Sequence, residues 1–145
     1  MKKFEDFNLK PETLKFIHLN HFKTPTPIQE QVIPAAVKGK DVIGLSKTGT
    51  GKTHAYLIPL MEKVDTDLKQ VQAVVTAPTR ELASQIYEQA KRMQDADPSL
   101  IVRLAVGGVD REREIRQIEK TQPHIVIGTP GRIKDLFLGA GALRI

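Results

Sequence analysis

With 145 residues, the chain is long enough for one domain with a hydrophobic core and too short for two. Its hydrophobic content of 40% and charged content of 27% are those of an ordinary globular protein. The absence of cysteine excludes a disulfide framework and a metal site built from thiolates. A net charge of +5 weakly favours a polyanionic partner, but an aromatic content of 5% provides no evident platform for stacking bases.

The N-terminal residues 1–6 lack the apolar run of a signal peptide, and no stretch approaches the length needed to span a membrane. We therefore expect a cytoplasmic protein with no membrane partner. The chain also shows no internal repeat and no low-complexity tract.

The first part of the chain predicts two helices. Residues 11–20 form the first, with Pro11 in its first turn. The second covers residues 27–37, where Thr26 is a suitable N-cap and Gln29, three residues later, completes the sequence pattern of a capping box.

A phosphate-binding loop is the most informative feature of the sequence. The apolar residues 41–45 predict a buried strand, and helical spacing begins after Lys52 and continues to Val64. Between them lies a turn with two glycines, which lets several backbone N–H groups face one anion at a helix N-terminus. Lys52 would reach the β and γ phosphates, and the Thr53 hydroxyl would bind Mg²⁺. The loop consists of Ser46, Lys47, Thr48, Gly49, Thr50, Gly51, Lys52 and Thr53.

The rest of the chain alternates between strands and helices. The predicted strands are apolar and cover residues 71–77, 100–106 and 125–128. The predicted helices cover residues 80–94, residues 110–120 and a last segment to about Leu138. This order predicts an α/β fold with a parallel sheet covered by helices on both faces. Ligands of such a sheet gather beyond the carboxyl ends of its strands. Four loops fall there: Ser46–Thr53, Pro78–Arg80, Gly107–Gly108 and Thr129–Arg132.

Two of these helices differ in their expected burial. The helix over residues 80–94 is amphipathic, with an apolar side formed by Leu82, Ile86, Ala90 and Met93. The helix over residues 110–120 is highly charged, and we expect it to bury little beyond Ile115 and Ile118. Its run Arg111-Glu112-Arg113-Glu114 is typical of a solvated face.

The four histidines lack the spacing of metal ligands, so we expect them to be surface or packing residues. They are His18, His21, His54 and His124.

Two arginines occupy positions where a helix dipole disfavours them. Arg80 and Arg132 lie at or just before predicted helix starts, and a cation there is slightly unfavourable unless an anion is close. This mismatch favours a phosphate ligand. The alternative is a surface salt bridge, for example to Glu81 or Asp135.

With these loops identified, the chain resembles the first part of the N-terminal RecA-like domain of the DEAD-box RNA helicases. The resemblance rests on five motifs in order over nearly the whole chain. They are the Q motif Phe22-Lys23-Thr24-Pro25-Thr26-Pro27-Ile28-Gln29, with Phe4 upstream; motif I at Ser46–Thr53; motif Ia, Pro78-Thr79-Arg80-Glu81-Leu82-Ala83; the double glycine Gly107-Gly108; and motif Ib, Thr129-Pro130-Gly131-Arg132. This family carries a small residue such as Ser46 in place of the first P-loop glycine.

The resemblance implies a RecA-like P-loop NTPase fold that uses ATP and Mg²⁺. It implies that the amide of Gln29 recognises adenine and that Phe22 stacks on it, within a Q motif that includes Pro27. A capping role for Gln29 and core packing of Phe22 are the alternatives. Both uses of Gln29 can coexist only in part, because one amide has few donors and acceptors.

The resemblance also implies a path for RNA along the loops that follow the later strands. Thr129 and Gly131 would line the RNA backbone, and Gly108 would offer an unobstructed backbone N–H. Such contacts position a strand without reading bases, so we expect sequence-independent RNA binding. Thr79 and Thr129 could instead be simple N-caps. The implied RNA-binding residues are Pro78, Thr79, Arg80, Gly107, Gly108, Thr129, Pro130, Gly131 and Arg132.

The chain departs from the family pattern in two places. His21 stands where the Q motif usually has glycine, and the sequence contains no Asp-Glu-Ala-Asp motif. We therefore expect a fragment of a longer helicase whose RecA-like domain is incomplete at its C-terminus. Residues 1–40 would form a Q-motif helical region, and residues 41–145 the N-terminal part of the first RecA-like domain.

The sequence thus predicts an ATP-dependent RNA helicase in the full-length protein, with weak ATP binding and negligible hydrolysis by these 145 residues alone. Two alternatives stay open, a DNA helicase or translocase and a non-catalytic nucleotide-binding module, whereas a P-loop kinase does not fit. The kinase leaves the Q motif and Thr129–Arg132 unexplained.

Overall fold

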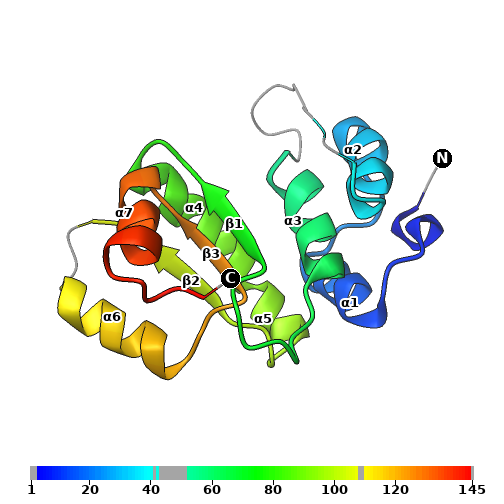
Figure 1. Cartoon of the computed structure of the whole chain (residues 1–145). Helices are drawn as coiled ribbons and strands as arrows, with labels where there is room; N and C mark the ends of the chain where they lie inside the picture. The colour runs from blue at the N-terminus through cyan, green and yellow to red at the C-terminus, as the bar shows by residue number, and fades with distance from the viewer. Residues whose placement is uncertain (1–2, 41, 43–51, 108–109, 145) are drawn as a thin grey trace. The chain divides into compact units, whose positions relative to one another are not determined.

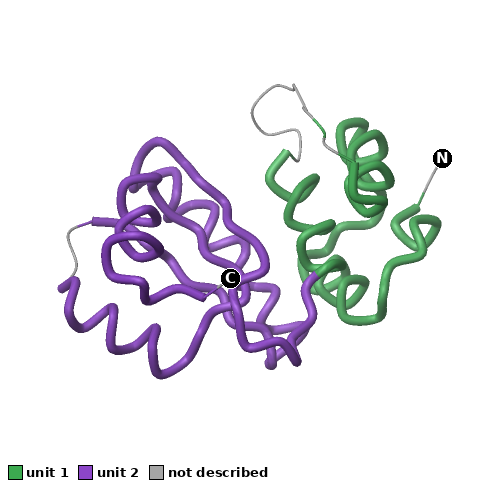
Figure 2. The backbone as a smooth tube through the Cα atoms, in the orientation of Figure 1, with its two compact units in different colours: residues 1–63 green, residues 64–145 purple. Residues whose placement is uncertain are grey.

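The computed structural model describes residues 3–40, 42, 52–107 and 110–144. The chain forms two compact units, residues 1–63 and residues 64–145 (Figures 1 and 2). The strand expected over residues 41–45 lies outside the described residues except for Val42, which is exposed. The loop residues from Ser46 to Gly51 also lie outside them, and so does Gly108.

The described residues of the first unit are helical, and the helices predicted over residues 11–20, 27–37 and 52–64 are confirmed with small shifts of their ends. Its elements are the 3₁₀ turn η1 (Phe4–Phe7), α1 (Pro11–Leu19), α2 (Pro27–Val37) and α3 (Lys52–Lys63). Helix α3 contacts both α1 and α2. The core of the unit is formed by large apolar side chains that are fully or almost fully buried, among them Phe4, Phe16, Ile17, Ile33, Leu57, Ile58 and Met61.

Helices α1 and α2 begin in different ways. The predicted capping box of α2 is confirmed: the Thr26 N–H donates to Oε1 of Gln29 (3.0 Å), and the Gln29 N–H donates to Oγ1 of Thr26 (3.4 Å). At α1 the N-cap is Lys10, whose side chain makes no capping hydrogen bond. The carboxylate of Glu62 on α3 supplies the cap instead, because it accepts from the Lys10 N–H through both oxygens (3.1 and 3.0 Å).

The second unit is an α/β layer structure. Its elements are β1 (Ala73–Thr76), α4 (Arg80–Lys91), α5 (Met93–Ala96), β2 (Val102–Ala105), α6 (Arg111–Lys120), β3 (Ile125–Gly128), α7 (Pro130–Lys134) and the π-helical turn η2 (Asp135–Gly139). In the described residues the sheet has the order β1-β3-β2, and both pairings are parallel. The predicted parallel sheet is therefore confirmed for these three strands.

Helices cover both faces of this sheet, and Figure 1 shows α4 on the opposite face from α6 and α7. On the α6 and α7 face, a buried apolar cluster joins Val126 of β3 to Ile118 of α6, Ile133 of α7 and Leu136 of η2. Helix α4 contacts β2 and β3. Strand β3 is the central strand, and all four of its residues are buried.

The helix after β1 is shorter than its amphipathic pattern predicts. It ends at Lys91, and Met93–Ala96 form the separate short helix α5. Ile86, Ala90 and Met93 are buried as expected, but Leu82 is 42% exposed. The expectation for Leu82 was wrong because Ala83, the next residue of the first turn, is the one that is fully buried.

The C-terminal segment is part of the core of the second unit. Ala142 and Leu143 are buried in the same cluster as Val126. The buried side chain of Gln122 connects this segment to α6, because its Nε2 donates to the carbonyls of Ala142 (2.8 Å) and Ile118 (3.1 Å) and its Oε1 accepts from the Arg144 N–H (2.9 Å).

His124 is a packing residue, as predicted, and it is fully buried just before β3. Its Nδ1 accepts from the Ile101 N–H (3.0 Å), and its Nε2 lies 3.2 Å from the Thr66 carbonyl oxygen. Because Nδ1 is the acceptor, the ring proton is on Nε2 and is donated to Thr66. The imidazole thereby connects β2, β3 and the segment that precedes β1 at the amino ends of the strands.

Candidate nucleotide and nucleic-acid site

The three described loops with RNA-site residues begin at the same level of the sheet. Thr76, the last residue of β1, pairs with Gly128 of β3, and Gly128 pairs with Ala105 of β2. The strands are parallel, so the residues that follow them leave the sheet side by side. Backbone hydrogen bonds continue one step further, because the Ala77 N–H donates to the Gly128 carbonyl (3.0 Å) and the Thr129 N–H donates to the Ala105 carbonyl (3.2 Å).

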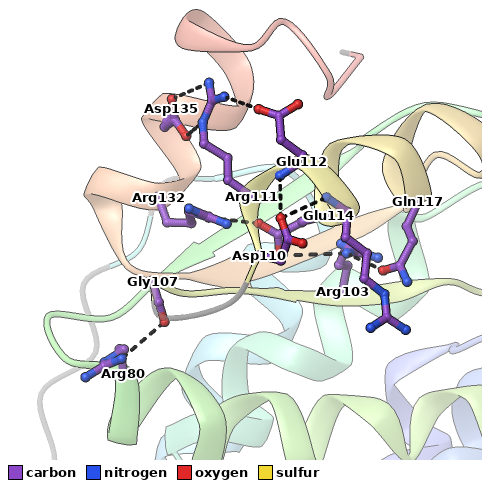
Figure 3. A network of polar contacts seen from close by, with 11 residues as sticks. Arg80, Arg103, Gly107, Asp110, Arg111, Glu112, Glu114, Gln117, Arg132 and Asp135 are labelled. Atoms are coloured by element: carbon purple, nitrogen blue, oxygen red, sulfur yellow. Dashed lines mark hydrogen bonds and ion pairs between the residues drawn. The ribbon is translucent and has the colours of Figure 1, made fainter.

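Arg80 connects the loop after β1 to the loop after β2. Its Nη1 donates to the Gly107 carbonyl oxygen at 3.2 Å, and the Arg80 side chain is on the exposed surface (Figure 3). Thr79 is an N-cap, as one of the two readings of the sequence had it, because its Oγ1 accepts from the Leu82 N–H (3.2 Å). Thr129 occupies the N-cap position of α7 without a side-chain capping bond.

Arg132 contacts a carboxylate of the protein itself. Its Nε lies 2.8 Å from Oε1 of Glu114, and the two side chains are only 13% and 5% exposed. The other oxygen of Glu114 lies 3.7 Å from Nη2 of Arg103 on β2. The sequence reading offered a phosphate or a surface pair with Asp135 or Glu81 for this arginine. The structure instead places Arg132 in a buried ion pair with Glu114.

The expectation of a solvated face for the charged run at the start of α6 is therefore wrong for Glu114, whereas the rest of the run is at least partly exposed. Glu112 and Arg113 are exposed, but Glu114 is buried between two arginines. Arg111 forms a two-bond pair with Asp135 of η2, with Nε–Oδ2 and Nη2–Oδ1 distances of 2.7 and 3.1 Å (Figure 3). The alternating charges of this segment give no local signal for these contacts, because both acidic and basic partners lie on other elements.

The Arg111–Asp135 pair shifts the pKa of both groups. The hydrogen bonds from Arg111 are the main reason that the pKa of Asp135 lies below its ordinary value. The same contact raises the pKa of Arg111. At neutral pH both groups are therefore charged, and the pair connects α6 to the turn that follows α7.

Glycines at this edge of the sheet have two different roles. A Cβ on Gly128 would lie 1.9 Å from the Ala105 carbonyl oxygen, so no larger residue fits there. By contrast, a Cβ on Gly107 or Gly131 would meet nothing within 4 Å. Gly131 lies in the first turn of α7, where glycine is a poor helix former, and no contact among the described residues requires it there. The open space at Gly107 and Gly131 suits a backbone that a ligand approaches closely.

The Q-motif residues lie in the first unit. His21 has φ = 61°, a left-handed conformation that glycine adopts most easily. Its N–H donates to the His18 carbonyl (3.0 Å), and the Phe22 N–H donates to the Ile17 carbonyl (3.2 Å). This is the Schellman arrangement that ends a helix, with His21 at the position where glycine is usual. The departure from the family pattern thus falls on a backbone position that favours glycine.

Aromatic contacts connect the Q motif to α3. The rings of Phe22 and His54 meet edge to face, with centroids 4.7 Å apart, and the Phe16 ring is 5.9 Å from His54. Phe22 is half-buried, so both its packing and its stacking role stay possible. His54 is in the first turn of α3, two residues after Lys52.

The described end of the phosphate-binding loop suits an anion. Lys52 begins α3 and is exposed, Thr53 is half-buried, and the first turn of α3 contains no acidic residue. The positive end of this helix is therefore not neutralised by its own side chains. Burial raises the pKa of the Tyr56 phenol, and a hydrogen bond with the Thr53 side chain acts in the opposite direction. Within the described residues, no group of three His, Asp or Glu side chains could hold a metal ion.

Comparison with known proteins agrees with this arrangement. The sequence profile of the DEAD/DEAH box helicases matches residues 26–144. The chain belongs to this family. The DEAD-box ATP-dependent RNA helicase CshB of Bacillus subtilis is 49% identical over 137 residues, which cover 93% of this chain and 31% of that helicase. CshB of Staphylococcus aureus is 44% identical over 133 residues, which cover 92% of this chain and 30% of that helicase.

Two solved structures of the helicase family share the fold. A DEAD box protein from the hyperthermophile Methanococcus jannaschii has a TM-score of 0.87 and 32% identity, and the match covers 98% of this chain and 38% of that one. Dbp5 of S. cerevisiae bound to RNA and ADP BeF3 has a TM-score of 0.84 and 27% identity, and the match covers 100% of this chain and 36% of that one. The predicted RecA-like α/β fold is thereby confirmed. The chain spans about a third of the length of these relatives.

No helix in the described part of the chain is both long and apolar enough to cross a membrane.

Proposed function

We propose that the full-length protein is an ATP-dependent RNA helicase in which the first unit binds the nucleotide and the loops of the second unit hold the RNA backbone. Family membership supports this, since relatives such as CshB of Bacillus subtilis carry the name DEAD-box ATP-dependent RNA helicase. A solved relative that shares the fold is bound to RNA and ADP BeF3.

The row of loops at the carboxyl ends of β1, β3 and β2 is the observation that carries the RNA assignment. The paired residues Thr76, Gly128 and Ala105 mean that the chain leaves the sheet side by side toward Pro78–Arg80, Thr129–Arg132 and Gly107. Gly107 and Gly131 leave open space beside the backbone. Such a surface suits sequence-independent contacts to phosphate and sugar, which position a strand without reading its bases.

The nucleotide would bind in the first unit. Lys52 and the N-terminus of α3 would neutralise the phosphates, and Thr53 would contribute its hydroxyl to Mg²⁺. The described residues fit this role because Lys52 is exposed and no acidic side chain competes in the first turn. The remaining phosphate ligands would be Ser46, Lys47, Thr48, Gly49, Thr50 and Gly51. When bound, ATP with Mg²⁺ supplies the hydrolysis that drives strand separation.

Adenine would be recognised by the side-chain amide of Gln29, next to Phe22 and Pro27. In the structure this amide also serves the capping box, because its Oε1 accepts from the Thr26 N–H at 3.0 Å. The two roles use different atoms in part, since the cap needs the acceptor oxygen and adenine N7 needs a donor.

A substitution at Gln29 separates these roles. In Gln29→Glu the carboxylate still accepts from the Thr26 N–H, so α2 should keep its cap, but the N–H donor is lost. We expect the preference for ATP over GTP to be lost, with some cost in stability because the Gln29 side chain is only 3% exposed and would carry a charge. Gln29→Ala serves as the matched control that removes both roles. If Gln29→Glu discriminates ATP from GTP as well as the unmodified protein does, the adenine role of Gln29 fails.

The RNA assignment is tested on the full-length protein by its ATPase activity with single-stranded RNA or DNA of the same sequence. Stimulation by RNA alone is expected. Equal stimulation by DNA would favour the DNA-translocase alternative, and no stimulation by either would favour a non-catalytic module.

Gly131→Ala should keep or slightly raise stability, because alanine is the better helix former by up to about 1 kcal/mol, yet it should weaken RNA binding. Gly128→Ala is the contrast, because its Cβ clashes within the chain and should destabilise the fold.

A further inference from the structure

Glu114 is a buried carboxylate to which the known motifs of the chain assign no role. It lies on α6, and Figure 3 shows it among arginines from two other elements. Oε1 lies 2.8 Å from Nε of Arg132 on α7, and Oε2 lies 3.7 Å from Nη2 of Arg103 on β2. With the Glu114 side chain 5% exposed, these contacts form in a poorly solvated place, where an ion pair is strong and an unpaired charge is costly.

We propose that Glu114 is a positioning residue for RNA binding: it holds Arg132 and thereby sets the start of α7, so that Arg132 acts through the protein and does not bind a phosphate itself. This inference rests on the proposed function of the loop Thr129–Arg132. Arg132 follows Thr129 and Gly131 directly, so fixing its side chain fixes the turn that would face the RNA.

The position of α6 makes it a suitable support. Asp110 caps this helix by accepting from the N–H groups of Glu112 (3.1 Å) and Arg113 (3.3 Å), so α6 begins four residues after Gly107 in the sequence. Arg111 and Glu114 are three residues apart and lie on neighbouring positions of the helix surface. They contact Asp135 of η2 and Arg132 of α7, respectively.

Two ion pairs therefore attach one face of α6 to the α7–η2 segment. Helix α6, which follows β2, and the α7–η2 segment, which follows β3, are thus connected by charged contacts as well as through the sheet. Arg132 is held in a buried ion pair, whereas Arg80 is on the exposed surface. The contact drawn for Arg80 in Figure 3 is a hydrogen bond to the Gly107 backbone carbonyl. Arg80 is accordingly the better placed of the two to meet a phosphate.

The salt dependence of RNA binding distinguishes positioning from contact. The logarithm of the binding constant falls with the logarithm of salt concentration, with a slope of about 0.7 for each neutralised phosphate of a single strand. In the full-length protein, Arg132→Gln should lower the affinity for a single-stranded oligonucleotide several-fold and leave this slope unchanged. Arg80→Gln should reduce the slope by about 0.7. A comparable reduction in Arg132→Gln would overturn the proposal, because Arg132 would then contact phosphate directly.

Two matched variants separate positioning from a general structural effect. Arg103→Gln removes the second arginine that contacts Glu114, and this arginine lies on β2 rather than on α7. Its RNA affinity should stay within about twofold of that of the unmodified protein, which is well below the several-fold cost of a lost direct contact. Glu112→Gln removes an exposed carboxylate two residues from Glu114 and should also have no effect. If Arg103→Gln weakened RNA binding as much as Arg132→Gln, Glu114 would be a stabilising residue and nothing more.

The pair itself is tested by a double-mutant cycle. Glu114→Gln should weaken RNA binding by the same factor as Arg132→Gln, and the double variant should add no further loss, because both act through one contact. Independent, additive losses would contradict the proposal. If Arg132→Gln proves too unstable, Arg132→Lys keeps the charge but lacks the planar guanidinium that meets Glu114. The proposal then expects a weaker affinity at an unchanged salt slope, and a fully preserved affinity would contradict it. Failure of the proposed function would appear differently, as absence of RNA binding by the unmodified protein.

Discussion

At the scale of single residues, His21 has a backbone conformation that is unfavourable for any residue with a side chain. Its φ of 61° lies in the left-handed region, which costs a non-glycine residue about 1 kcal/mol. The conformation is required because the His21 and Phe22 N–H groups close the C-terminus of α1. The penalty is therefore imposed by the turn.

Replacing this residue should stabilise the protein. We expect His21→Gly to raise the free energy of unfolding by up to about 1 kcal/mol, because the turn then needs no strained backbone. Urea unfolding followed by circular dichroism measures the change. Lys23→Gly is the control, since its backbone is not left-handed and glycine there should only increase the entropy of the unfolded chain. A destabilised His21→Gly protein would mean that the imidazole contributes more than the backbone costs.

The Arg111–Asp135 pair predicts a defined pH dependence. The pKa of Asp135 is lowered in the folded protein, so the pair stabilises the fold above the ordinary pKa of aspartate, about 3.9. This contribution is lost as the pH falls through the lower pKa of the folded state. Asp135→Asn should therefore be less stable than the unmodified protein at pH 7, and this difference should shrink as the pH falls below the ordinary pKa of aspartate. Asp67→Asn, which removes an exposed carboxylate of the same unit, should show no such convergence.

At the scale of elements, α1 depends on another helix for its N-terminal cap. Lys10 makes no side-chain cap, and Glu62 of α3 accepts from the Lys10 N–H and from Oγ1 of the buried Thr13 (2.9 Å). A carboxylate at this position also interacts favourably with the helix dipole. The contact therefore contributes both to the start of α1 and to its packing on α3.

Removing this cap should destabilise the first unit. We expect Glu62→Ala to lower the free energy of unfolding by about 1–2 kcal/mol, in the range of lost N-caps and of buried hydrogen-bond partners. Amide hydrogen exchange should localise the effect to the first turn of α1. Glu12→Ala is the matched control: it removes an exposed glutamate from the same turn and should cost less than about 0.5 kcal/mol through the dipole alone. Equal losses in both variants would contradict a capping role for Glu62.

The sequence predicts those elements whose signals are local. Thr26 and Gln29 are three residues apart, so their capping box is visible in the sequence and defines the start of α2. The strands can be predicted because short, near-continuous apolar runs between turn residues are typical of buried strands. The short strands of the structure lie inside the predicted ones, whose ends continue as backbone hydrogen bonds such as Ala77 to Gly128.

Contacts between distant elements are the part that the sequence does not predict. Glu114 and Arg132 are 18 residues apart, and Glu62 and Lys10 are 52 apart. A glutamate in a run of alternating charges has the same local pattern whether it is solvated or buried. Only the position of α6 against β2 and α7 makes Glu114 a buried partner, so its role emerges from the tertiary structure.

At the scale of the whole molecule, the proposed ligands belong to different units. The nucleotide residues Gln29, Lys52 and Thr53 are in residues 1–63, whereas the loops proposed for RNA are in residues 64–145. Each unit has its own apolar core. Binding of ATP and binding of RNA should therefore be separable by mutation: Gln29→Glu should leave RNA affinity unchanged, and Gly131→Ala should leave ATP affinity unchanged.

Hydrolysis, by contrast, should exceed what these 145 residues can do alone. Phosphoryl transfer depends on positioning and on charge neutralisation around the γ-phosphate. Lys52 and Thr53 can hold a triphosphate, but the chain contains no Asp-Glu-Ala-Asp sequence, whose carboxylates would complete the Mg²⁺ site and orient the attacking water in this family. We expect the isolated chain to bind ATP weakly, in a manner that Lys52→Ala abolishes, and to show no turnover above background with or without RNA.

The measurement is phosphate release from ATP by the isolated chain and by the full-length protein at equal concentration, with and without single-stranded RNA. Lys52→Ala in each provides the background. Because arginine and carboxylate groups at the γ-phosphate contribute several orders of magnitude to such reactions, a partial set of ligands should leave a rate indistinguishable from that background. RNA-stimulated turnover by the isolated chain that disappears in Lys52→Ala would show that its own side chains suffice, and the proposed division between holding and cleaving the triphosphate would be wrong.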